Sequence, residues 1–134
     1  VALLTVIITA SIIFTVAALI PFINIKMDVY IADDTFMAEG GGYKCSINIG
    51  DIQEVQLFDE MPKDNFTRTN GGSTDEYDVG NYKGRTYGKC MLFIWDDYSP
   101  VLMIKSSNKT VFVNSKEDGY IRQMYDELVS YAGK

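Results

Sequence analysis

The chain has 134 residues, with 18 acidic and 12 basic side chains, a net charge of −6 and no histidine. The missing histidine excludes histidine-dependent catalysis and histidine metal sites, and the acidic balance argues against nucleic-acid binding, which usually requires a basic face. Every charged side chain lies after residue 25. This distribution leaves room for one hydrophobic segment, residues 1–25, and one small domain, residues 26–134.

The hydrophobic segment, residues 1–25, is predicted to be a transmembrane helix. Its apolar stretch would form a helix of roughly 34 Å, which is enough to cross a hydrocarbon core of about 30 Å. A signal sequence and a buried core helix are the alternatives, but a signal sequence should show a basic start and a cleavage site. The prediction therefore places the protein in a membrane, with one helix or more. Few basic residues lie near the membrane exit, so the sequence does not determine on which side of the membrane the domain lies.

The following residues are predicted to form about seven antiparallel strands, because apolar and polar side chains alternate within residues 27–58 and 82–113. The run Gly40-Gly41-Gly42 supplies the backbone freedom of a hairpin turn. Residues 59–81 are rich in Asp, Asn, Gly and Thr and are predicted to form a long loop. Residues 89–95 are apolar on both alternations, so they are expected to form a central strand that is covered on both faces.

Residues 116–132 are predicted to form one C-terminal amphipathic helix. Ser115 and Asp118 resemble an N-capping pair, and Gly133 stands where a helix usually ends. The apolar side chains of the helix recur at helical spacing and must be buried, so the helix is expected to cover an open end or face of the sheets. This apolar stripe consists of Ile121, Met124, Tyr125, Leu128, Val129 and Ala132.

Four short stretches carry a resemblance to a known family. They are Leu57–Pro62 (LFDEMP), Arg68–Gly71 (RTNG), Lys83-Gly84 and Tyr87–Phe93 (YGKCMLF). Together they resemble small bacterial pleckstrin-homology (PH) domains of the membrane-anchored type. The resemblance implies a PH-like barrel of two orthogonal sheets that the C-terminal helix closes at one corner, and a membrane-associated role. It implies no particular chemistry.

Arg68, Asn70 and Lys89 are the candidate site residues. They either tie the long loop to the barrel through hydrogen bonds or line a site for a small ligand or peptide. No catalytic set is recognisable, and no metal or cofactor is expected, because the paired carboxylates fall at predicted turns. Cys45 and Cys90 lie in predicted strands and are expected to be buried free thiols, which mildly favours the cytoplasmic side, although the pair also permits a disulfide.

These features favour a non-enzymatic binding or scaffold module that engages protein or peptide partners at the membrane. Self-association through exposed strand edges is a further expectation, and no nucleic-acid partner is expected. The alternative is a lipid- or bilayer-surface sensor, which would depend on a local basic spot such as Lys26, Lys44 and Lys89 because the net charge opposes anionic lipid. An enzyme is the third interpretation, since fold alone does not determine function.

Overall fold

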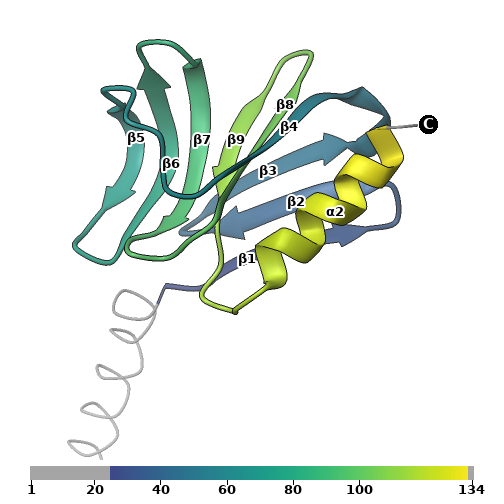
Figure 1. The fold of residues 1–134 in the computed structure, drawn as a ribbon. Coiled ribbons are helices and arrows are strands. Elements are labelled where there is room, and N and C mark those ends of the chain that lie inside the picture. Colours follow the sequence, from purple (N-terminus) through teal and green to yellow (C-terminus); the bar gives the residue numbers. More distant parts are fainter. Residues whose placement is uncertain (1–24, 133–134) are drawn as a thin grey trace, which may run out of the picture.

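The computed structural model describes residues 25–132, which form a mainly β structure with one C-terminal helix, α2 (Tyr120–Ala132) (Figure 1). In this part of the chain nine strands form a three-stranded sheet, β1-β2-β3, and a six-stranded sheet in the order β4-β8-β9-β7-β6-β5. The 3₁₀ turn Ile49–Asp51 links the two sheets. The strands are β1 (Met27–Ala32), β2 (Thr35–Gly40), β3 (Tyr43–Asn48), β4 (Ile52–Phe58), β5 (Thr67–Ser73), β6 (Tyr77–Gly84), β7 (Gly88–Trp95), β8 (Val101–Ser106) and β9 (Thr110–Val113).

The prediction of a mainly β fold with one C-terminal helix is confirmed, but the predicted barrel of about seven antiparallel strands is wrong. Residues 25–132 form nine strands in two sheets and no closed barrel. In addition, β7 and β9 pair in parallel. This pairing arises because the chain leaves β7, runs through β8 beside β4, and returns as β9 into the place between β8 and β7.

The chain enters the domain beside the β2–β3 turn. A Cβ atom on Gly41 would stand 3.0 Å from both the Ile25 Cδ1 atom and the Val79 Cγ1 atom, so these three residues meet at one point. Between residues 25 and 132 no helix has the length and apolar character needed to span a bilayer. The predicted transmembrane segment, residues 1–25, lies outside the described residues except for Ile25.

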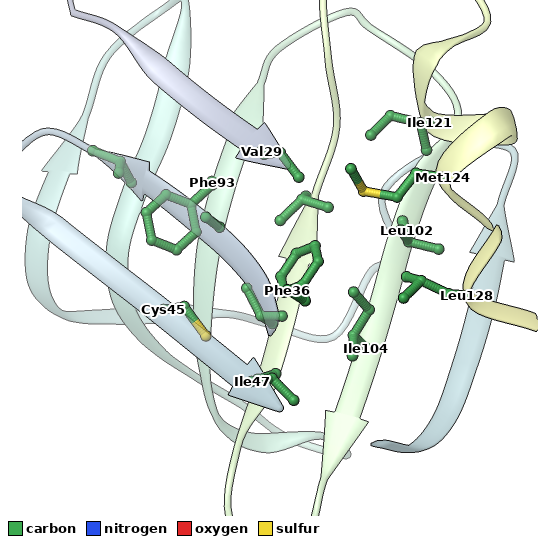
Figure 2. Packing of buried hydrophobic residues seen from close by; sticks show 14 residues of the cluster. Val29, Phe36, Cys45, Ile47, Phe93, Leu102, Ile104, Ile121, Met124 and Leu128 are labelled. Carbon is green, nitrogen blue, oxygen red and sulfur yellow. The ribbon is translucent and has the colours of Figure 1, made fainter. Parts of the chain in front are cut away.

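Helix α2 packs beside β4 and β8 and closes one side of the main apolar core. Figure 2 shows Ile121, Met124 and Leu128 of the helix lying beside Leu102 and Ile104 of β8. The Tyr120 hydroxyl donates a hydrogen bond to the Val29 carbonyl oxygen of β1. The helix therefore bridges the outer strand of each sheet, and we call this side of the molecule, made of α2, β1 and β4, the helix flank.

The predicted helical stripe is right for its central residues. Ile121, Met124 and Leu128 are buried and Tyr125 is half-buried, but Val129 is 42% exposed. Val129 lies outside the stripe because the buried strip is narrow and follows spacings of three and four residues from Ile121. The side chain of Ala132 lies outside the described part of the structure.

The predicted capping pair is wrong. The Ser115 hydroxyl accepts a hydrogen bond from the Glu117 amide, but the helix begins only at Tyr120. Gly119, with a φ of +77°, precedes the helix, and its carbonyl oxygen accepts the first helical hydrogen bond from the Gln123 amide. A glycine therefore makes the turn that directs the chain into α2.

Most of the predicted long loop, residues 59–81, is in fact the hairpin of β5 and β6. Gly71 and Gly80 face each other in this hairpin, with φ values of +132° and +125°. A Cβ atom on Gly71 would lie 2.1 Å from the Val79 carbonyl oxygen, and one on Gly80 would lie 2.4 Å from the Asn70 carbonyl oxygen. The glycines therefore permit a close approach of two strands. The high glycine content of this segment had instead suggested a loop.

The rest of that segment, residues 59–66, crosses the outer face of the six-stranded sheet and is called the crossing segment. Its Phe66 ring contacts the Phe112 ring of β9 edge-on at a centroid distance of 5.6 Å, and Tyr87 contacts the same ring at 5.1 Å. These aromatic side chains cover a second apolar cluster that includes Cys90 and Leu92 of β7. Strand β7 is thus covered on both faces, as its apolar sequence predicted.

Asp64 holds the crossing segment to the β6–β7 turn. Its buried carboxylate accepts hydrogen bonds from the Thr86 amide at 2.8 Å and the Tyr87 amide at 2.9 Å, and its carbonyl oxygen accepts one from the Arg85 amide. Burial acts to raise the pKa of Asp64, but these hydrogen bonds outweigh it and hold the pKa below the usual value of 3.8. A Cβ on Gly84 would lie 2.2 Å from the Asp64 carboxylate, so this position requires glycine.

Candidate functional site: a lysine groove

A groove of about 530 Å³ opens beside the ends of β6 and β7 that flank their connecting turn. Strands β3, β5, β6 and β7 and the β8–β9 turn contribute its walls. Its lining includes four lysines and no carboxylate, whereas the whole chain is acidic with a net charge of −6. We call it the lysine groove, after Lys44, Lys83, Lys89 and Lys109.

One face of the β6–β7 pair leads from the core into the lysine groove. Side chains alternate along strands, so three successive cross-strand pairs lie on the same face. The first pair is buried in the core, the second is half-buried and the third is exposed. The pairs, in this order, are Val79–Phe93, Asn81–Met91 and Lys83–Lys89.

The last of these pairs places two cations directly opposite each other. Like charges at directly opposite positions of antiparallel strands destabilise the sheet. Within residues 25–132 the only salt bridge joins Lys44 Nζ and Glu39 Oε1 at 3.6 Å, so Lys83 and Lys89 are not neutralised by a carboxylate there. The repulsion between Lys83 and Lys89 is therefore locally unfavourable at this end of the groove.

The other two lysines of the groove are held by the protein. Lys109 Nζ donates a hydrogen bond of 2.7 Å to the Ser46 carbonyl oxygen of β3, and Lys44 is paired with Glu39 on the neighbouring strand β2. Lys109 therefore adds positive charge to the groove from a fixed position, whereas the charge of Lys44 is balanced by Glu39. Lys83 and Lys89 remain available to a ligand.

The remaining titratable groups of the groove are neutral at physiological pH. Burial, together with the charge of Asp64, raises the pKa of the Cys90 thiol to about 11. Burial and the neighbouring Asp78 charge raise the pKa of Tyr82 to about 12. The positive charge of the groove therefore comes from its lysines, and the Cys90 thiol is a poor nucleophile at neutral pH.

The three residues predicted as a site do not form one cluster. Lys89 lines the lysine groove. Asn70 Oδ1 accepts a hydrogen bond of 2.7 Å from the Tyr43 hydroxyl, which ties β5 to β3. Arg68 is exposed on β5 opposite Tyr82 and forms no salt bridge within the described part of the chain. Lys89 thus fits the ligand interpretation, and Asn70 fits the structural one.

Sequence reasoning did not identify Lys83 and Lys109 as site residues. The strand pattern predicted within residues 82–113 gave no sign of the true β6–β7 turn, which is formed by residues 85–87. A turn centred there pairs Gly84 with Gly88 and Lys83 with Lys89. The symmetric spacing of these residues in the sequence could have indicated the hairpin and the lysine pair. Lys109 is 63 residues from its partner Ser46, and no local pattern indicates that contact.

A second pocket, of about 490 Å³, lies at the other end of β6 and β7 and is acidic. Burial, followed by the charges of Asp78 and Asp97, raises the pKa of Asp96. Within residues 25–132 no group of three or more potential ligands is arranged to hold a metal ion. The carboxylates that line this pocket are Asp59, Glu60, Asp78, Asp96 and Asp97.

Cys45 and Cys90 are both buried and free. Cys45 belongs to the core between the two sheets, and Cys90 belongs to the cluster on the outer face of the six-stranded sheet. The prediction of buried free thiols is therefore confirmed.

Comparison of the chain with family models, curated proteins and solved structures gives no match. The function of the lysine groove is therefore inferred from its own geometry and charge.

Proposed function

We propose that this chain is a non-enzymatic binding or scaffold module, held at a bilayer by a transmembrane helix at residues 1–25, whose lysine groove binds an acidic segment of a protein or peptide partner. The observation that carries the proposal is the convergence of four lysines, of which only Lys44 has a carboxylate partner within residues 25–132, in a chain of net charge −6. A concentrated positive field of this kind attracts and orients an anionic partner. The resemblance to small membrane-anchored bacterial PH domains supports the same role.

The position of the groove favours a protein partner over the lipid of the same membrane. Ile25 meets Val79 near the start of β6, and Lys83 lies four residues further along that strand, at about 13 Å. Figure 1 shows the β6–β7 turn at the end of the sheet opposite to the entry of the chain. A helix that precedes Ile25 would therefore hold the Lys83–Lys89 end of the groove away from its own bilayer.

The acidic pocket points to the same conclusion. Trp95 lines this pocket and also lines a small pocket together with Ile25, so the acidic end of the domain adjoins the entry of the chain. Carboxylates near a bilayer surface repel anionic lipid. We therefore rank the lipid- or bilayer-surface sensor second.

Binding without catalysis agrees with the chemistry of the groove. The chain has no histidine, and the Cys90 thiol stays protonated at neutral pH, so the groove lacks an activated nucleophile and its base. We place the domain on the cytoplasmic side, because free thiols persist in a reducing compartment.

The test is binding of a fluorescent hexaglutamate peptide to the full chain in phosphatidylcholine nanodiscs, measured by anisotropy at low salt. We expect the double change Lys83→Gln and Lys89→Gln to weaken binding about tenfold or more, because two charge-assisted contacts are lost. The control is Lys63→Gln, an exposed lysine in the crossing segment outside the groove.

Equal binding by the double variant would overturn the proposal. Recruitment of phosphatidylserine vesicles that depends on Lys83 and Lys89, in the absence of peptide binding, would instead favour the lipid sensor.

A further inference from the structure

The Lys83–Lys89 pair indicates which anion the groove accepts. We propose that this pair binds a doubly charged oxyanion, namely a phosphorylated side chain of the partner, in preference to a single carboxylate. The inference rests on the proposed function of the lysine groove and specifies its ligand.

The geometry provides two ammonium groups for one site. Lys83 and Lys89 are directly opposite in an antiparallel pair and lie on the same face, which places their Cβ atoms about 5 Å apart. Both side chains are exposed, and neither has a carboxylate partner within residues 25–132. Two free ammonium groups on neighbouring stems repel each other until an anion lies between them.

Charge matching favours a phosphate over a carboxylate. A carboxylate carries one negative charge on two oxygens and can neutralise only one lysine. A phosphate monoester carries about −1.5 to −2 charges at pH 7 and three acceptor oxygens. Each ammonium group offers three donors, so one phosphate can bind both lysines at once.

The surroundings of the pair suit a ligand that carries its phosphate on a carbon stem. Met91 and Asn81 form the adjacent cross-strand pair on the same face and are half-buried. Met91 offers an apolar surface for the stem, and Asn81 offers an amide. Lys109, held by the Ser46 carbonyl oxygen, adds positive charge to the same groove without taking the place of the Lys83–Lys89 pair, and Lys44 is balanced by Glu39.

A phosphorylated peptide fits the site better than a phospholipid headgroup of the anchoring membrane. The pair lies at the far end of β6 from Val79, which is the strand position that Ile25 adjoins. A soluble segment of a partner protein can reach that end of the domain, whereas the headgroups around the anchor lie at the other end.

The experiment uses the full chain in phosphatidylcholine nanodiscs with two matched probes, phenyl phosphate and benzoate, measured by calorimetric titration. We expect phenyl phosphate to bind about tenfold tighter than benzoate. The preference should rise from about pH 5 to pH 7.5, because the second proton of a phosphate monoester leaves near pH 6. Lys83→Gln and Lys89→Gln should each abolish it, and Lys63→Gln should leave it intact.

Three outcomes would overturn the inference in different ways. If hexaglutamate binds through Lys83 and Lys89 but phenyl phosphate has no advantage over benzoate, the phosphate preference is wrong and the proposed function stands. If neither hexaglutamate nor phenyl phosphate binding depends on Lys83 and Lys89, both proposals are wrong. If only vesicles containing phosphatidic acid bind, and binding depends on the pair, the ligand is a lipid headgroup. Thermal unfolding of each variant, which alters only an exposed side chain, verifies that it is folded.

Discussion

The helix flank and the opposite side of the sheet pair differ in how completely apolar side chains close them. On the helix flank, Ile121, Met124 and Leu128 are buried against strands of the core. On the opposite side, polar contacts such as that between the Tyr43 hydroxyl and Asn70 link β3 to the six-stranded sheet, and the lysine groove opens there. The helix side is thus closed by buried apolar side chains, whereas the opposite side leaves an open groove, to which we assign the proposed binding.

The magnitudes explain this division. Burial of a large apolar side chain contributes about 1.5–3 kcal/mol before the entropy cost of ordering it. An intramolecular hydrogen bond contributes a net of about 0.5–1.5 kcal/mol, and exposure to water lowers that further. A like-charged cross-strand pair is unfavourable. The lysine groove therefore lies where a change of sequence costs the fold least.

The helix flank should show the largest effect of a single substitution. Leu128→Ala removes a side chain that is 1% exposed and leaves a cavity under α2, so the free energy of unfolding should fall by about 2–5 kcal/mol. Urea unfolding measures this change. The matched control on the same helix is Val129→Ala, at a side chain that is 42% exposed, which should change stability by about 0.5 kcal/mol or less. Equal losses would show that the helix does not close the core.

The crossing segment should show an intermediate effect that depends on pH. The pKa of Asp64 is lower in the folded chain, so its contribution to stability is present above the unfolded pKa of about 3.9 and disappears as the pH falls through the folded value. Asp64→Asn should lower the melting temperature by several degrees at pH 7, and the difference from wild type should shrink as the pH falls below the unfolded pKa of about 3.9. Asp126→Asn, on the exposed face of α2, is the control. A difference that stays constant from pH 7 to about pH 3 would contradict this role of the carboxylate.

The lysine groove should show the smallest effect on stability. Lys83→Gln relieves the repulsion with Lys89, so the free energy of unfolding should stay constant or rise by up to about 0.5 kcal/mol, while anion binding is lost. Chemical denaturation and peptide titration of the same sample give both values. A loss of more than about 1 kcal/mol would show that the pair supports the fold, and the contrast between the two sides of the molecule would then be wrong.

The parts of the fold that the sequence predicts are those in which apolar side chains recur at regular spacing. The helical spacing of Ile121, Met124 and Leu128 and the two apolar faces of β7 were sufficient to predict α2 and a central strand. The β5–β6 hairpin was not predictable in the same way. Gly71 and Gly80 provide no side chains for an alternating pattern, and their close backbone approach gives the segment the composition of a loop.

The candidate site was predictable only in part for a related reason. Lys89 was identified as one of three candidate polar residues, at the start of the predicted apolar strand 89–95. Its partner Lys83 was not, because the position of a hairpin turn must be known before two residues can be placed opposite each other. The placement of Lys109 at the same groove depends on the pairing of β8 with β9 and on the approach of β3, which are contacts between distant parts of the chain.

The glycine pair of the β5–β6 hairpin also limits how this protein can vary. If one strand slid by one residue so that Asn70 stood opposite Gly80, a side chain would replace Gly71 at the point where a Cβ atom would stand 2.1 Å from a carbonyl oxygen. The turn between the strands, residues 74–76, should therefore accept exchanges of amino acid more readily than a change of length that shifts the pairing in this direction. Homologous chains should keep the distance between these two glycines constant, and an epitope tag or fluorophore would be better introduced elsewhere.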